Sequence, residues 1–167
     1  MKKIIKLSYF LFVSLAIVSC SKDDDKEQEI FTNTIEYDGV SFNVEQTNIF
    51  DYGTFEGYYN YEFELEGTSS DETSLYIYMG LFSKGTESFR TGTFQFYDSD
   101  DIEAAPDFVF PYGEIKVGND EYMEAVGGTV VVTKNGDIYT ISAQITLEND
   151  EVVTVSYSGT FTVTIDN

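Results

Sequence analysis

The chain has 167 residues and a formal net charge of −21, because 30 Asp and Glu residues outnumber 9 Lys and Arg residues. Such a surface repels nucleic acid and anionic lipid headgroups, so neither is expected as a partner. The chain contains no His and one Cys, which excludes His-dependent catalytic triads, imidazole metal sites and an intramolecular disulfide.

Residues 1–19 are predicted to be a signal peptide. Basic residues precede an apolar run over residues 7–18, and a small residue, Ser19, follows it. The apolar run is too short to cross a bilayer core of about 30 Å as a helix. Residues 17–20, with the sequence Ile-Val-Ser-Cys, resemble the bacterial lipobox. This resemblance implies cleavage before Cys20 and acylation of Cys20 with chains such as palmitate, which would anchor the protein in the outer membrane.

An acidic tether over residues 20–33 follows the predicted cleavage point. Like charges repel one another along it, and it has no apolar surface to bury, so it is predicted to be solvated and extended. Its residues after the Cys are Ser21, Lys22, Asp23, Asp24 and Asp25. They resemble the export signal of Bacteroidota surface lipoproteins, which implies a position on the cell surface. The alternative is an acidic spacer on a lipoprotein that faces the periplasm.

Residues 34–167 are predicted to form one all-β domain, because apolar and polar residues alternate along them with a period of two. The expected strands cover residues 35–37, 40–44, 59–65, 75–82, 92–97, 108–110, 114–117, 129–133, 137–147 and 153–165. Asp38-Gly39, Asn135-Gly136 and Asn149-Asp150 are typical of tight turns. Residues 46–57 are expected to form a loop.

Short turns between antiparallel strands indicate either a β-sandwich or an up-and-down β-barrel. The antiparallel β-sandwich is preferred, because Gly159 interrupts the long alternation over residues 153–165. A bend or bulge at this glycine would let one strand serve two sheets. The barrel is the alternative. Residues 75–82 are apolar on both faces, which predicts a central strand.

Several segments of the domain combine turn and strand residues in one order along the chain. They are Asp51-Tyr-Gly53, residues 75–82, Thr91-Gly-Thr-Phe94, residues 127–141 and Tyr157-Ser-Gly-Thr-Phe161. This pattern resembles small Bacteroidota lipoproteins of unassigned function. The resemblance implies the all-β fold and the location, and it implies no catalytic residue.

Aromatic side chains are the main candidates for ligand contact. Tyr52, Tyr58 and Tyr59 gather where the expected loop meets the next strand, and Tyr97 and Tyr112 flank an acidic segment. Exposed Tyr rings can stack on sugars or anchor a protein partner. The alternative is that these rings cover the end of the core.

The acidic segment is the candidate cation site. It contains Asp98, Asp100, Asp101 and Glu103, whose oxygens could bind Ca²⁺ weakly. The segment lacks the Gly and the distal Glu of an EF-hand loop, so the alternative is a hydrated acidic loop. No other cofactor is expected.

Three functions are compatible with these features. The preferred one is a non-catalytic binding or structural module on the cell surface, whose partner is a glycan, a peptide or a surface protein. The second is a β-barrel that carries a small apolar ligand among its aromatic side chains. The third is a carboxylate-based glycoside hydrolase, which needs two carboxyl groups in one cleft. Glu62, Glu64 and Glu66 share one predicted strand face, which is expected to be solvated, and the chain is not expected to be an enzyme.

Overall fold

The computed structural model describes residues 31–98 and 104–166. Cys20, the predicted signal peptide and the predicted export signal at residues 21–25 lie outside this part of the chain. The described residues are all-β, as the sequence predicts, and none of them forms a helix long and apolar enough to cross a membrane. The strands are β1 (Thr34–Tyr37), β2 (Val40–Phe55), β3 (Tyr58–Thr68), β4 (Ser74–Lys84), β5 (Gly92–Phe96), β6 (Phe108–Val117), β7 (Met123–Asn135), β8 (Ile138–Leu147), β9 (Val152–Gly159) and β10 (Thr162–Ile165).

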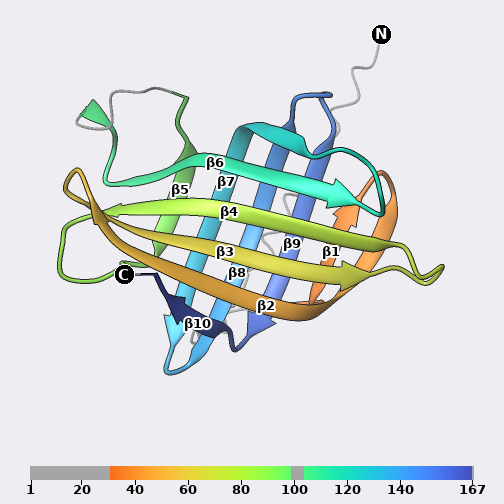
Figure 1. Cartoon of the computed structure of the whole chain (residues 1–167), viewed down its shortest axis with the longest axis horizontal. Coiled ribbons are helices and arrows are strands. Elements are labelled where there is room, and N and C mark those ends of the chain that lie inside the picture. Colours follow the sequence, from red (N-terminus) through yellow and green to blue (C-terminus); the bar gives the residue numbers. More distant parts are fainter. Residues whose placement is uncertain (1–30, 99–103, 167) are drawn as a thin grey trace, which may run out of the picture.

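Nine of the strands close into a barrel. The strand order is β1-β9-β8-β7-β5-β6-β4-β3-β2, and the ring closes because β1 pairs antiparallel with both β9 and β2. The last strand, β10, lies outside the ring and pairs parallel with β2. In Figure 1, β2, β3, β4 and β6 run across the strands β7, β8 and β9 that lie behind them.

The preferred prediction of a β-sandwich is therefore wrong, and the barrel alternative is correct. Closure pairs both edges of the sheet, which removes the unpaired edges that a sandwich would have to protect. The order nevertheless departs from a simple up-and-down barrel. β6 lies between β4 and β5 and pairs parallel with β5, while its other end pairs with β7.

The expected loop at residues 46–57 is instead most of β2. This strand carries register shifts between Val44 and Gln46 and between Asp51 and Gly53. Each shift inserts a residue and moves the following side chains to the other face of the sheet. The apolar pattern is therefore broken twice, which hides the strand from a search for alternation.

The expected bend at Gly159 is present. β9 ends at this residue, and after it the chain leaves the ring as β10, which joins the outer edge of β2. A Cβ atom on Gly159 would lie 2.3 Å from the Tyr157 hydroxyl oxygen, so this close approach favours glycine. The bend thus separates one predicted strand into two.

The interior of the barrel is filled by side chains from the inward faces of its strands. Every strand of the ring contributes a fully or nearly fully buried apolar residue, among them Ile35, Ile49, Phe63, Ile77, Phe94, Phe110, Val130, Ile141 and Val155. Burying such side chains contributes about 1.5–3 kcal/mol each relative to exposure. Aromatic rings from β3, β8 and the β9–β10 connection meet edge to face in this core.

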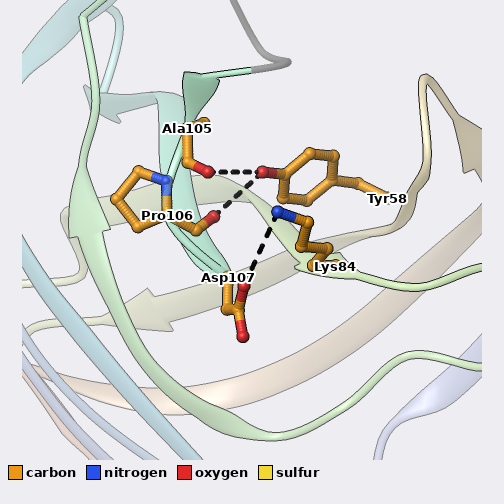
Figure 2. A network of polar contacts seen from close by, with 5 residues as sticks. All are labelled: Tyr58, Lys84, Ala105, Pro106 and Asp107. Atoms are coloured by element: carbon orange, nitrogen blue, oxygen red, sulfur yellow. Dashed lines mark hydrogen bonds and ion pairs between the residues drawn. The ribbon is translucent and has the colours of Figure 1, made fainter.

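A second, smaller apolar cluster lies on the outside of the barrel. Tyr58 and Phe82 project outward from β3 and β4 and are covered by Ala105 and by Val109. Figure 2 shows how the covering segment is held: the Tyr58 hydroxyl donates to the carbonyl oxygens of Ala105, at 2.8 Å, and Pro106, at 3.0 Å.

Candidate ligand-binding face

The outward side chains of β2, β3, β4 and β6 form the candidate site. Phe63 and Leu65 point into the barrel, so the alternating residues Glu62 and Glu64 point outward. The strand register places Glu62, Gly80 and Tyr112 side by side across β3, β4 and β6. By the same register, Glu64, Tyr78 and Glu114 lie in the next row.

Four tyrosine rings follow one another across this surface, which we call the tyrosine row: Tyr112, Tyr78, Tyr76 and Tyr122. Neighbouring ring centroids are 6.3 Å, 6.1 Å and 6.5 Å apart in that order. Tyr112 and Tyr122 are exposed, and the two central rings are half-buried. The row therefore presents a continuous aromatic surface that is accessible to solvent.

A fifth ring, Tyr52, is also exposed and lies on the same face. It stacks against Phe50 with a centroid separation of 6.4 Å. The charge of Glu62 raises the pKa of Tyr52, and the charge of Tyr52 raises the pKa of Tyr112. The three side chains therefore lie near one another. The face thus has aromatic rings on both sides of the Glu62 carboxyl group.

Gly80 makes room for one ring of the row. A Cβ atom at this position would lie 2.2 Å from Cζ of Tyr112. Real atoms do not approach so closely, so the Tyr112 ring can lie over β4 only because residue 80 has no side chain. This glycine therefore sets the position of the ring at one end of the row.

The carboxyl groups between the rings accept hydrogen bonds from them. The Tyr76 hydroxyl donates to Glu64 Oε1, and Asn48 Nδ2 donates to Glu64 Oε2 at 3.4 Å. The Tyr78 hydroxyl is hydrogen-bonded to Glu114. These bonds hold carboxylate oxygens between the aromatic rings, where they remain acceptors for other donors.

Burial and like charge shift the pKa values on this face. Partial burial raises the pKa of Glu62 above its ordinary value, and the nearby charge of Glu64 raises it further. Burial raises the pKa of Tyr112 to about 12, with the charge of Glu62 as the second cause. Burial also raises the pKa values of Tyr76 and Tyr78, which are hydrogen-bonded to carboxylates.

One polar group beside this row has no partner. Asn60 lies on the outward face of β3, is 8% exposed, and is hydrogen-bonded to Tyr112 through its side chain. Within residues 31–98 and 104–166, its Oδ1 atom has no hydrogen-bond donor. A buried acceptor without a donor is destabilising, and such groups often mark functional positions.

Two hollows in the surface adjoin the tyrosine row. One, of about 340 Å³, lies between β6 and β7 and is lined by Tyr112, Glu114 and the exposed Val126. The other, of about 370 Å³, is lined by Tyr76 and Lys116 together with residues of β2, β3 and β4 and with Gly118, which follows β6. Both hollows share a ring with the row, so the row connects them.

The structure separates the five tyrosines that the sequence singled out. Tyr52 and Tyr112 belong to the face, whereas Tyr58 is only 2% exposed and lies under residues 105–106. Tyr58 therefore covers apolar surface instead of presenting a ring to a ligand. Tyr97 packs against the same outer cluster as Tyr58. Tyr59 lies on the inward-facing side of β3, and its hydroxyl donates to Asp51 Oδ2 at 3.2 Å.

The candidate cation site is described only at its first residue. Asp98 is exposed, and Asp100, Asp101 and Glu103 lie outside the described residues. Within the described ranges, no group of three or more His, Cys, Asp or Glu side chains is arranged to hold a metal ion. The weak Ca²⁺ site remains a prediction.

Three rings of the tyrosine row were not among the sequence candidates. Tyr76 and Tyr78 alternate with buried residues along β4, which is the period of an exposed strand face. Tyrosine was counted as apolar, so this strand was expected to be covered on both sides. Reading the pair as amphipathic would have identified an exposed aromatic face on β4, although not its neighbours Tyr112 and Tyr122.

The chain was also compared with known proteins. Searches among protein-family models, curated proteins and solved structures find no match to it.

Proposed function

We propose that the chain is a surface lipoprotein, anchored in the outer membrane through acyl chains on Cys20, whose barrel is a non-catalytic module that binds a glycan. The observation that carries the binding proposal is the tyrosine row. Its rings offer flat faces for stacking on sugar rings, and Glu62, Glu64 and Glu114 offer acceptors for sugar hydroxyl groups.

The geometry favours a neutral, extended glycan over other ligands. The row links two hollows, so a chain of several sugar units would contact both. The carboxyl groups disfavour an anionic ligand through like charge.

The binding proposal is tested on a glycan array with the mature chain carrying Cys20→Ser, which removes the need for lipid. Tyr78→Ala and Tyr112→Ala are expected to weaken binding to the best neutral glycan about tenfold or more, because each loses a stacking surface. Val163→Ala is the matched control, since Val163 is exposed on β10 and away from the row. Equal binding by all three variants would refute the assignment of the face.

The location is tested by labelling intact cells. A variant in which residues 22–25 are replaced by neutral residues is expected to lose surface labelling while it retains the lipid. Mass spectrometry of the native protein should show acylation at Cys20. An uncleaved N-terminus, or surface labelling that does not depend on residues 22–25, would contradict this part of the proposal.

A specific observation favours one second candidate, a carboxylate-based glycoside hydrolase. Glu62 has a raised pKa and lies beside Glu64, and a general acid with a neighbouring carboxylate is what such a reaction needs. If the protein releases reducing ends from the bound glycan and Glu62→Gln abolishes this release, the hydrolase is the correct function and the non-catalytic binding module is rejected. The carrier of a small apolar ligand has less support, because side chains fill the interior of the barrel.

A further inference from the structure

One end of the barrel is hollowed into a pocket that is separate from the tyrosine row. It has a volume of about 560 Å³. Its walls come from the β1–β2 turn, the β3–β4 loop, the β6–β7 loop and the β8–β9 loop, which meet at this end. A volume of this size is within the range of about 300–1,000 Å³ that small organic ligands occupy.

The floor of the pocket is apolar. Phe42, which is 2% exposed, belongs to the barrel core, and Val117 and Met123 pack partly buried against that core. Val40 and the ring of Tyr37 complete the apolar lining. A ligand in the pocket would therefore place an apolar body against the end of the core.

The rim of the pocket carries a single sign of charge. Its acidic residues are Asp38, Asp71, Asp120, Glu121 and Glu151, and no Lys or Arg of the described part of the chain lines it. Within the described ranges, the one ion pair is Lys84 with Asp107, so none of these carboxylates is paired with a protein cation. Low-dielectric walls lined by one sign of charge concentrate ions of the opposite sign.

Two of the rim carboxylates are held in place by neutral donors. Glu151 Oε2 accepts from the Tyr37 hydroxyl and from Asn149 Nδ2, the latter at 2.9 Å. Asp71 Oδ1 accepts from the Ser69 hydroxyl and from the backbone N–H of Thr73. The Ser69 and Thr73 bonds lower the pKa of Asp71, which keeps its carboxylate charged. These donors fix the carboxylates without neutralising them.

From the apolar floor, the acidic rim and the size of the pocket, we propose that the end of the barrel binds a small organic cation: a primary amine or a guanidinium carried on an apolar body. The apolar body lies against Phe42 and Met123, and the cationic head lies between Asp71 and Glu151. The site is independent of the glycan face, so either proposal can fail while the other stands.

Isothermal titration of the mature chain with phenethylamine and with its neutral analogue 2-phenylethanol tests the proposal. Phenethylamine is expected to bind about tenfold more tightly than the alcohol, and its affinity should fall as salt is added. Glu151→Gln and Asp71→Asn should each weaken amine binding by about fivefold or more. Asp137→Asn, at the turn on the opposite end of β8, should leave it unchanged.

A second arm identifies the source of the cation. A capped tetrapeptide with one Lys beside one Phe carries the same chemistry on a peptide. Tighter binding of the peptide would indicate that the natural ligand is a cationic side chain of a partner protein. Tighter binding of phenethylamine would indicate that it is a free amine. Lack of saturable binding by both probes, equal affinity for the alcohol, or unchanged binding in Glu151→Gln would overturn the proposal.

Discussion

Tyrosine side chains on the outer face combine two chemical properties in one residue. Their rings contact one another across β4 and β6, and their hydroxyl groups reach carboxylates on neighbouring strands. Glu62 is half-buried among them, and this burial removes water from its carboxyl group. The same residues that create an aromatic surface therefore make a nearby charge unfavourable.

The raised pKa of Glu62 makes stability depend on pH in a defined direction. The folded state favours the uncharged form of the Glu62 carboxyl group. The resulting contribution to stability is fully present below the pKa of Glu62 in the unfolded chain, and it is lost as pH rises through the raised pKa of the folded state. Glu62→Gln, which stays uncharged, should raise the free energy of unfolding at about pH 7 by up to about 1 kcal/mol. At about pH 4 or below it should change little, because Glu62 is then mostly protonated in both states.

Urea unfolding of both proteins at the two pH values measures this difference. Glu66→Gln is the matched control, because Glu66 is exposed on the same side of β3. Its effect should stay within about 0.5 kcal/mol at either pH. A Glu62→Gln variant that is less stable than the parent at neutral pH would contradict the assigned burial effect.

Alanine substitutions at two glycines distinguish the positioning of the Tyr112 ring from the stability of the barrel. Gly80→Ala should displace the Tyr112 ring, which can swing toward solvent, so glycan binding should fall while stability changes by about 1 kcal/mol or less. Gly128→Ala should cost about 2–4 kcal/mol, because its φ is +126° and a Cβ would lie 2.2 Å from the Gln144 carbonyl oxygen. Thermal unfolding and glycan titration of both variants test the contrast. A Gly80→Ala variant that binds normally would contradict it.

At the scale of single elements, the Tyr58 hydroxyl group helps to hold the covering segment at residues 105–107, whose Asp107 carbonyl oxygen also accepts from the Lys84 backbone N–H at 2.8 Å. Tyr58→Phe leaves two carbonyl oxygens without their donor (Figure 2), and it should cost about 1–2 kcal/mol of unfolding free energy. The comparison variant is Asp107→Asn, which removes only the exposed ion pair with Lys84 at 3.8 Å. That change should cost less than about 0.5 kcal/mol. Equal costs in urea unfolding would contradict the role of the hydroxyl.

The elements that the sequence predicted well are those whose signals are local. Asn135-Gly136 joins β7 to β8 as expected, and alternation marks most of β8 and β9. The start of β2 was predicted at residues 40–44, but its continuation over residues 46–55 was missed because its two bulges each reverse the facing of later residues. The tyrosine row was missed for a related reason: it is assembled from β4, β6 and the β6–β7 connection, and no local spacing connects these segments.

For the whole molecule, alternation could not decide between a sandwich and a barrel. Both folds bury one face of each strand and expose the other, so their strands have the same pattern. Ile35 on β1 lies opposite Phe42 on β2 in a local hairpin, whereas the deciding contacts are long-range, such as that of Ile35 with Val155 on β9. Such pairings close the ring across most of the chain, and a single sequence carries no direct signal for them.

The acidic charge and the partly covered tyrosines together predict how the whole barrel responds to alkaline pH. Burial raises the pKa values of Tyr61 and Tyr112 to about 12 and shifts those of Tyr76 and Tyr78 in the same direction. A raised folded pKa stabilises the protein fully below the unfolded value near 10, and this stabilisation is lost as pH rises through the folded value.

The free energy of unfolding should therefore fall by at least about 2 kcal/mol between about pH 9 and pH 11.5, in step with ionisation of Tyr followed by absorbance at 295 nm. Tyr76→Phe combined with Tyr78→Phe should reduce this fall, because those two hydroxyl groups no longer ionise. General repulsion in a chain of net charge −21 also grows with pH, but added salt screens it. Repeating the unfolding in about 0.5 M NaCl separates the two effects. A fall that salt abolishes, or that the double variant leaves unchanged, would assign the alkaline response to surface charge and not to the tyrosine hydroxyl groups.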